Sequence, residues 1–241
     1  SAASDVYKRQ QLDVPMINML EQKFEKSHFT RVDSDVIDRL IVKEDQKGEE
    51  LADTKREILS TVFSGQLPKV QKTEFHVETQ AMGETAAPIV ITQAEYMRRM
   101  KEMANIQPGM SFYGEMPSMF NLVLNSDHRL IKQVLEDAES ACSEKLVPVE
   151  SEIAMLKLRE NELHKAHEGK KDEEIPTTEK DELHDVEKKL DEQKKQKTDI
   201  INEYAAGNKV VHQLIDLALL QNNMLKGEAL TNFVKRSIEL I

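Results

Sequence analysis

A pair of heptad repeats in the second half of the chain constrains the fold more than any other sequence feature. In each repeat, core positions recur at alternating intervals of four and three residues, which places them along one seam of a helix. The polar segment HEGKKDEEIPTTEKD, which contains a Gly and a Pro, separates the two repeats. The pattern therefore predicts a long antiparallel coiled-coil helical hairpin over about residues 140–205.

The seam of this predicted hairpin is thin. Glu160, Gln193 and Lys197 occupy positions where an apolar side chain would pack, so we expect a protruding arm. Its role stays open between a solvated spacer, the usual role of such dense charge, and a docking arm for a partner. The predicted seam positions are Cys142, Leu146, Val149, Ile153, Leu156, Glu160 and Leu163, then Leu183, Val186, Leu190, Gln193, Lys197, Ile200 and Tyr204.

The segments around the hairpin mix helical and strand patterns. We expect an α+β fold, with a small αβα piece followed by a small antiparallel or mixed sheet packed with helices. Ser126 or Asp127 should cap the helix that follows the last strand. The predicted elements are helices at 16–24, from 33, at 53–64 and at 93–106, and strands at 29–32, 72–79, 88–92 and 119–125.

The chain also divides by composition. Residues 1–10, SAASDVYKRQ, start without Met and continue no later pattern, so we expect a non-native scar there. Residues 11–45 form the αβα piece, and the charged segment at 46–53 is a plausible linker. Residues 54–241 then form the larger domain that carries the hairpin as an insertion.

Charge and cysteine content exclude several classes of protein. The formal net charge is -11 with 32% charged residues, and no basic block is long enough to attract nucleic acid. A single cysteine, Cys142, cannot form an intrachain disulfide, which favours a reducing, cytoplasmic location. Since no apolar run approaches the roughly 20 residues of a membrane helix, we expect no membrane partner.

Motifs of catalytic sites are not found. The eight glycines contain no G-x-G spacing, so neither a dinucleotide loop nor a phosphate loop is predicted. Cys142 has no neighbouring cation to activate its thiol. His164, His167 and His184 could approach one another across the hairpin, but solvated side chains explain them better than a metal hydrolase does. We therefore predict no catalytic, cofactor or metal site in this chain.

Methionines concentrate between residues 96 and 120, which hold six of the chain's 11. Tyr96, Met97, Met100 and Met103 follow helical spacing. Core packing is the ordinary explanation of such a stripe, yet Met also suits surfaces that must accommodate many partners. Core positions are expected for Met116, Met119 and Phe120.

Two amphipathic helices end the chain, and each carries an apolar stripe wider than one helix can bury alone. The stripes could pack on the chain's own sheet. They could also form a four-helix bundle between two copies, and this second arrangement predicts a homodimer. The predicted dimer interface consists of Val210, Leu214, Leu217, Ala218, Leu230, Phe233, Val234, Ile238 and Ile241.

Three ordered segments resemble one protein family. They are LEQKFEKSHFTRVDSDVIDRLI, FNLVLNSDHRLIKQV and QLIDLALLQNNMLKGEALTNFVKRSIELI. In the second, Asn125, Asp127 and His128 match the Asn-Pro-Asp-His of that family, with Ser126 in place of Pro. The chain is thus similar to the ninety-kilodalton heat-shock chaperones, in their bacterial form, over nearly all of residues 11–241 except the hairpin.

The resemblance implies a division of labour. In this family an N-terminal domain binds and hydrolyses ATP with Mg, a middle domain contributes to hydrolysis and contacts clients, and a C-terminal domain holds two protomers together. This chain would then be the end of the middle domain, at 11–45, plus the dimerisation domain. ATP and Mg would belong to the parent chaperone, and the fragment itself would be no enzyme and hold no cofactor.

The resemblance also implies partners, namely a second copy and unfolded client proteins. In this family the methionine-bearing helix projects into the cleft between protomers, which implies client contact by Tyr96, Met97, Met100, Met103 and Ile106. The chain ends at SIELI without the acidic tail that recruits tetratricopeptide co-chaperones, so that partner is not expected. The alternative is a dimeric scaffold that displays a coiled-coil arm and has no client role.

Overall fold

The computed structural model of the protein describes residues 15–24, 29, 51–69, 72–93, 95–104, 116–169 and 175–239. These residues form two compact units, and the predicted α+β class is confirmed. The first unit draws on described residues up to 52, on 67–131 and on 213–239, and the second on 53–66 and 132–212. Helices α6 (Arg129–His167) and α8 (Lys209–Gln221) each contribute residues to both units.

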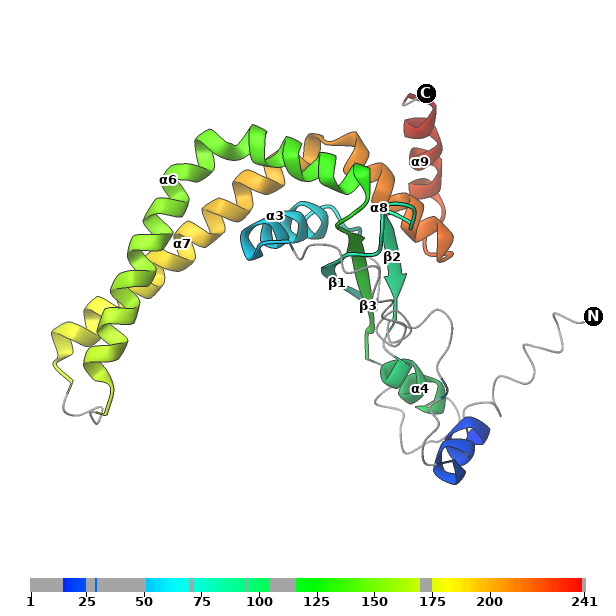
Figure 1. Ribbon diagram of the computed structural model, residues 1–241, viewed down its shortest axis with the longest axis horizontal. Coiled ribbons are helices and arrows are strands. Elements are labelled where there is room, and N and C mark those ends of the chain that lie inside the picture. The colour runs from blue at the N-terminus through cyan, green and yellow to red at the C-terminus, as the bar shows by residue number, and fades with distance from the viewer. Residues whose placement is uncertain are drawn as a thin grey trace, which may run out of the picture. The chain divides into compact units, whose positions relative to one another are not determined.

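A three-stranded sheet lies at the centre of the first unit. Its strands are β1 (Thr73–Gln80), β2 (Ile89–Thr92) and β3 (Ser118–Asn125), in the order β1-β3-β2 (Figure 1). β1 is parallel to β3 and β2 is antiparallel to it, so the sheet is mixed. In the second half of β3 successive side chains are buried on both faces, and this half of the strand forms the core of the unit.

The turn from β3 into α6 is built on a buried amide. Asn125 Oδ1 accepts hydrogen bonds from the backbone N–H groups of Met82 and Asp127, both at 3.1 Å, and Asn125 Nδ2 donates to Gly83 O at 2.8 Å. Gly83 has a φ of 84°, a conformation that favours glycine. Its N–H donates to Asp127 Oδ2 at 2.9 Å.

The helix cap predicted at Ser126 or Asp127 is wrong. α6 begins at Arg129, and His128 caps it, because His128 Nδ1 accepts a hydrogen bond from Leu130 N–H at 3.1 Å. The Asp127 carboxylate is instead engaged by the loop at Gly83. Asp127, which local sequence rules favour as a helix cap, thus bonds instead to a loop that is distant in sequence.

One short helix and the residues of β3 complete the first unit. The helix at 15–23 agrees with the first predicted helix, whereas the strand and helix predicted from 29 onward lie outside the described residues apart from Phe29. Met119 is exposed, so its predicted core position is wrong: it lies in the first half of β3, where the face opposite Phe120 is not covered. Phe120 is half-buried, with its ring centroid 5.9 Å from that of Phe75.

The second unit contains the two long helices of the repeats, α6 and α7 (Thr177–Gly207), which lie side by side (Figure 1). They run in opposite directions, because Lys145 pairs with Glu203 at 2.9 Å while Arg159 pairs with Glu182 at 2.7 Å. Every predicted seam position is buried or half-buried. α6 remains helical through Pro148.

A third helix, α3 (Asp53–Ser64), belongs to the same unit and packs on α7. It buries Ile58, Leu59, Val62 and Phe63. A Cβ atom on Gly65 would lie only 1.9 Å from Asn202 Oδ1, so the two chain segments approach closely there. The pair of α6 and α7 is therefore packed against a third helix, whereas the sequence predicted an arm of two helices.

Candidate interaction surfaces

The methionine stripe lies on α4 (Glu95–Ala104), as its spacing predicted. Tyr96 is 66% exposed, and Met97, Met100 and Met103 are half-buried. Ile106, the last residue predicted for this surface, lies outside the described residues. Of the four described side chains, the Tyr96 ring is therefore mostly exposed, whereas the three methionines are partly packed and partly accessible to solvent.

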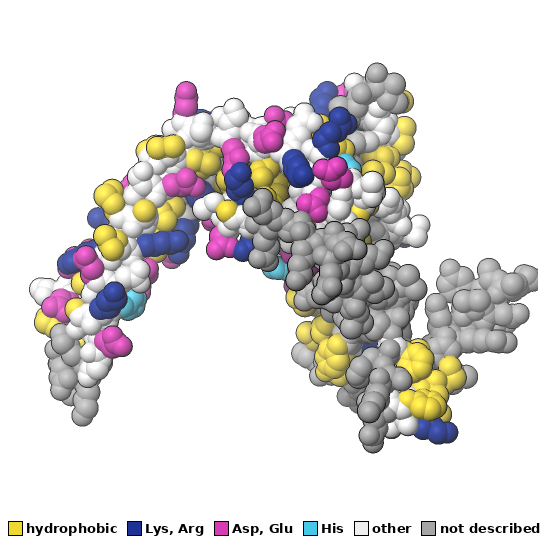
Figure 2. Space-filling view, in the orientation of Figure 1, with side chains coloured by type: hydrophobic (Ala, Val, Ile, Leu, Met, Phe, Trp, Pro, Cys, Tyr) yellow, Lys and Arg dark blue, Asp and Glu magenta, His cyan; other side chains and the backbone are white. Residues whose placement is uncertain are grey.

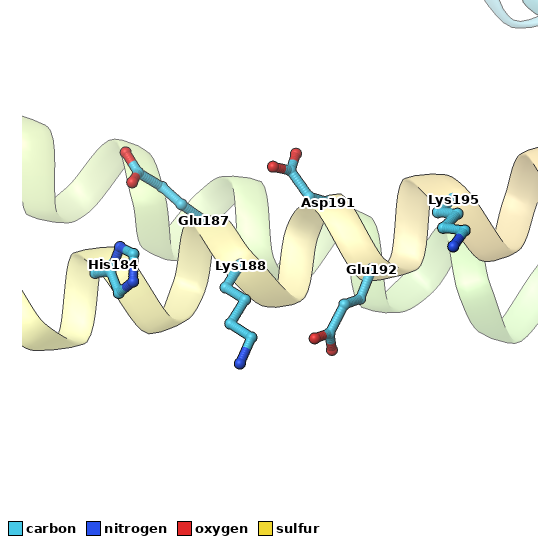
Figure 3. A pocket seen from close by; sticks show the side chains of 6 residues that line it. All are labelled: His184, Glu187, Lys188, Asp191, Glu192 and Lys195. Atoms are coloured by element: carbon cyan, nitrogen blue, oxygen red, sulfur yellow. The ribbon is translucent and has the colours of Figure 1, made fainter.

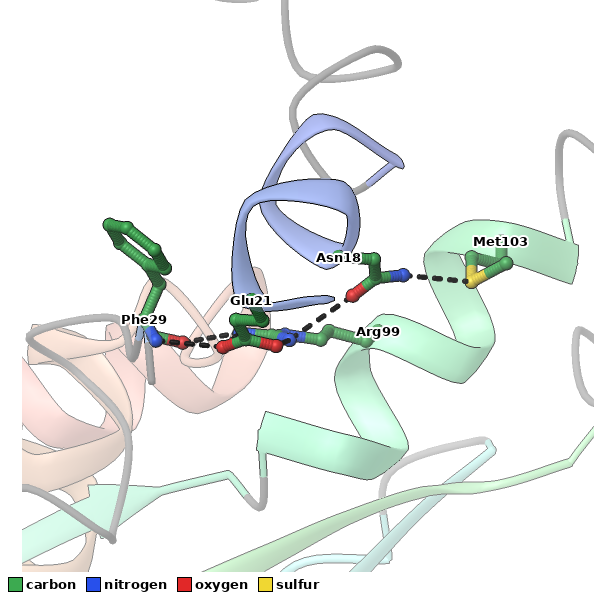
Figure 4. A network of polar contacts seen from close by, with 5 residues as sticks. All are labelled: Asn18, Glu21, Phe29, Arg99 and Met103. Atoms are coloured by element: carbon green, nitrogen blue, oxygen red, sulfur yellow. Dashed lines mark hydrogen bonds and ion pairs between the residues drawn. The ribbon is translucent and has the colours of Figure 1, made fainter. Parts of the chain in front are cut away.

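The polar face of α4 fixes the helix in place (Figure 4). Arg99 donates to Glu21 Oε2 at 2.8 Å, to Asn18 Oδ1 at 3.2 Å and to the backbone oxygen of Phe29. Asn18 also donates to the sulfur of Met103 at 3.8 Å. An arginine fork on a carboxylate is among the stronger polar contacts, so Arg99 ties α4 to the helix at 15–23.

A lysine ties the same helix to the sheet. Lys101 Nζ donates to Ser118 Oγ at 2.6 Å and to the backbone oxygen of Met116 at 2.9 Å. Neither cation was assigned an anchoring role from the sequence, although both flank the methionine stripe: Arg99 and Met103 contact the same residue, Asn18. The polar contacts thus hold α4 while Tyr96 stays exposed.

Further apolar side chains are exposed near this anchored helix. Apart from Tyr96 on α4, they lie on or after the helix at 15–23, which Arg99 joins to α4. Flexible methionines and aromatic rings in such a setting are typical of surfaces that bind apolar partners. The exposed side chains are Met16, Met19, Phe24, Phe29 and Tyr96.

Helices α8 and α9 (Glu228–Glu239) form the second candidate surface. Arg236 pairs with Asp216 and donates from Nε to Gln213 Oε1 at 3.0 Å. Gln213 in turn donates to Ser237 Oγ at 2.6 Å. These polar contacts fix α9 on α8 without using the apolar stripe.

The predicted dimer positions differ in exposure. Leu214 and Ala218 are buried within the single chain, at 5% and 2% exposure, and Leu230 and Phe233 are half-buried. α9 itself has no buried residue, and hydrophobic side chains are visible at the surface around it in Figure 2. Ile241 lies outside the described residues. The exposed members are Val210, Leu217, Val234 and Ile238.

A nucleophilic site is not supported by the surroundings of Cys142. The expectation that no cation lies near Cys142 is wrong, because Lys145 is close enough to favour the thiolate. Burial nevertheless outweighs Lys145 and raises the pKa of the Cys142 thiol, which disfavours the reactive thiolate. An open groove of mixed charge runs along α7 (Figure 3). His184, Glu187, Lys188, Asp191, Glu192 and Lys195 line this groove.

The three histidines considered for a metal site have different neighbours in the structure. His167 Nε2 lies 3.1 Å from Glu179 Oε2, and His184 lines the groove on α7. Among the described residues, Glu160, His164 and Glu187 are the group whose ligand atoms converge.

No helix in the described part of the chain is long and apolar enough to cross a membrane.

Comparison with known proteins identifies relatives over almost the whole chain. A chaperone protein HtpG of Bacteroides fragilis is 67% identical over 231 residues, which is 96% of this chain and 34% of that protein. The HtpG of Bacteroides thetaiotaomicron is 65% identical over the same length and shares of the two chains. That of Porphyromonas gingivalis is 45% identical over 234 residues, again 96% and 34%.

These relatives confirm the resemblance to the ninety-kilodalton heat-shock chaperones in their bacterial form. The matched residues include the segment predicted as the hairpin, because the matches cover 96% of the chain. The chain spans about a third of the length of the curated relatives that it matches. No protein-family model matches the chain. No solved structure matches it either.

Proposed function

We propose that this chain, as a homologue of HtpG chaperones, provides homodimerisation and client contact for an ATP-dependent molecular chaperone that assists protein folding. The nucleotide site, with ATP and Mg, would belong to the rest of the longer protein, and the parent would work in the cytoplasm. Residues 11–45 would be the end of a middle domain and 54–241 the dimerisation domain. The long helical pair would be a coiled-coil arm carried by that domain.

The exposed apolar side chains of α8 and α9 are the observation that carries this proposal. Leu217, Val234 and Ile238 are 39%, 49% and 69% exposed. Two copies of such a helix pair can form a four-helix core, a patch that is complementary to itself. Obligate interfaces bury on the order of 2,000 Å² in total, enough for a lasting dimer when the core is apolar.

A charge at the most exposed position of α9 tests the dimer. We expect Ile238→Asp to convert the dimer to monomers in sedimentation velocity, because a carboxylate would be buried without a partner. Such burial costs about 3–5 kcal/mol, more than a hundredfold in the dissociation constant. Phe233→Asp should act in the same direction, although its half-buried ring also packs within the chain.

Val147→Asp is the matched control for this test. Val147 is 62% exposed on α6, and its substitution should leave the dimer unchanged. A dimer that survives Ile238→Asp would reject the assignment. Equal dissociation by Val147→Asp would place the interface elsewhere.

The surface of α4 is proposed as the client contact. A chaperone binds many unrelated apolar segments weakly, and Tyr96 with the half-buried methionines can repack around each of them. The polar anchors at Arg99 and Lys101 support this assignment, because they hold the helix without burying Tyr96.

Two variants separate client contact from core packing. Tyr96→Ser removes an exposed ring, so we expect weaker suppression of client aggregation in light scattering with an unchanged thermal midpoint. Replacement of Met97, Met100 and Met103 by Ser should reduce client binding strongly and stability moderately, because these side chains are half-buried. Lost stability without a selective loss of client binding would mean that the stripe is core.

A further inference from the structure

A carboxylate interrupts the seam of the hairpin at Glu160. This residue is half-buried between the apolar seam positions Leu156 and Leu163. A charge removed from water without compensation is unfavourable, and the described residues provide Glu160 with no hydrogen bond or ion pair. Glu160 therefore needs a positively charged or hydrogen-bonding partner, whereas an apolar residue at this seam position would need none.

Two further ligand atoms face this carboxylate. His164 follows Glu160 by one helical turn on α6, so both side chains lie on the same face of that helix. Glu187 reaches them from α7, and one ligand atom from each of the three lies within 4.8 Å of the others. Figure 3 shows the Glu187 carboxylate directed away from Lys188, its neighbour on α7.

The arginine next to Glu160 in the sequence is paired with other carboxylates. Arg159 contacts Glu182 at 2.7 Å and Glu162 at 3.1 Å. Glu160 and Glu187, in contrast, have no ion pair within the described part of the chain. The two helices thus bring two carboxylates and an imidazole together at a place where their charges are not balanced.

We propose that Glu160, His164 and Glu187 bind a divalent transition metal ion, with zinc as the best fit, and that the ion clamps α6 to α7. Zinc accepts imidazole nitrogen and carboxylate oxygen, and a water molecule can complete its tetrahedron. Magnesium and calcium fit less well, because they prefer oxygen ligands throughout.

The geometry needs only a small closure. Tetrahedral zinc bonds of about 2.1 Å place donor atoms about 3.4 Å apart, so ligand atoms now within 4.8 Å must move together. His164 and Glu187 are exposed and can rotate toward Glu160. Since the complete ligand set exists only when α6 and α7 are paired, binding must stabilise the paired helices.

Metal titration of the chelator-treated chain tests the proposal. We expect isothermal titration calorimetry to give one zinc ion per chain, and cobalt to give the absorption bands of a tetrahedral site. Zinc should also raise the thermal midpoint. Glu160→Gln and His164→Ala should each weaken zinc binding at least tenfold, because each removes one of three protein ligands.

His184→Ala is the matched control, since this histidine lies on the same helix as Glu187 but outside the cluster. Its zinc affinity should equal that of the unchanged chain. Affinity that falls equally in His184→Ala and His164→Ala would overturn the proposal, as would zinc binding no tighter than magnesium. His164 is exposed, so His164→Ala should fold normally by circular dichroism and keep the test decisive even if Glu160→Gln disturbs the seam.

Discussion

Asn125 shows how one buried amide organises a turn. Its side chain bonds to the backbone at Met82, Gly83 and Asp127, and it has no exposed surface. Buried backbone groups need partners, and here one side chain satisfies three of them. The same residue belongs to the motif that carried the family resemblance, so its structural role gives that motif a physical reason.

Removal of this amide should destabilise the first unit. Asn125→Ala leaves two N–H groups and one carbonyl without partners, and we expect a loss of roughly 2–5 kcal/mol in the free energy of unfolding. Urea unfolding measures this. Asn222→Ala is the control, because exposed Asn222 makes a single bond to Ala218 O and its loss should stay below about 1 kcal/mol. Equal losses would contradict the role given to Asn125.

Local sequence rules could not identify the roles of Asn125, Asp127 and His128. By those rules Asp127 is a better helix cap than His128. The structure reverses this, because the loop at Gly83, far away in sequence, engages the Asp127 carboxylate. A prediction from neighbouring residues cannot include a contact that only the folded chain creates.

At the scale of helices, Lys197 joins α3 to the pair of α6 and α7, an association that the sequence did not predict. Its amine lies 2.9 Å from Glu57 of α3 and 3.1 Å from Glu150 of α6, and its side chain is almost fully buried on α7. Lys197 was predicted as a weak point of the seam. It is instead a residue that bonds α3 to the hairpin, as does the ion pair of Lys55 with Glu139 at 3.8 Å.

Two substitutions of Lys197 separate the contribution of its stem from that of its charge. Both glutamates are 43% or more exposed, so the ion pairs should contribute little, and the buried stem should contribute more. We expect Lys197→Met to cost less than about 1 kcal/mol and Lys197→Ala about 2–3 kcal/mol. Urea unfolding distinguishes the two. Equal losses would show instead that the charge dominates.

Elements with a strong internal period were predictable, and pairings between distant elements were not. The heptad pattern carried α6 correctly through Pro148, where a local rule would have ended the helix. The pattern of β1 and β3 gave each strand but not their parallel pairing, which depends on chain direction in space. The association of α3 with α7 had no signal, because an amphipathic helix does not specify its partner.

For the molecule as a whole, the apolar stripe of α8 shows where one sequence stops being informative. Leu214, Leu217 and Ala218 all follow helical spacing, yet the chain buries the first and third and leaves Leu217 exposed. Periodicity identifies apolar faces and does not divide them between the chain's own core and a second copy. The structure makes that division, and it concentrates the proposed interface on Leu217, Val234 and Ile238.

Three ionisable groups, all of them in the second unit, make the stability of the protein sensitive to alkali. Burial raises the pKa of the Cys142 thiol above its ordinary 9.0 and the pKa of the Tyr204 phenol above 10.0. Burial alone would lower the pKa of Lys197, but hydrogen bonds to Glu57 and Glu150 outweigh it and hold the pKa above 10.5. In all three cases the folded state keeps its proton to higher pH than the unfolded state does.

Stability should therefore fall as the pH rises above about 9. Below that pH both states hold these protons and the full stability is present. Between the unfolded and folded pKa of each group, the free energy of unfolding falls by up to about 1.4 kcal/mol per pH unit. The growing negative charge of a chain already at -11 acts in the same direction.

Urea unfolding from about pH 7 to about pH 11 checks this expectation. The unchanged chain should begin to lose stability near pH 9, where the unfolded thiol loses its proton. In Cys142→Ala the loss should begin near pH 10 instead, because the Tyr204 phenol and the Lys197 amine then titrate first. An onset that does not move in this variant would show that Cys142 does not couple folding to pH. Constant stability up to about pH 11 would contradict all three assignments, since each requires the folded chain to bind its proton more tightly.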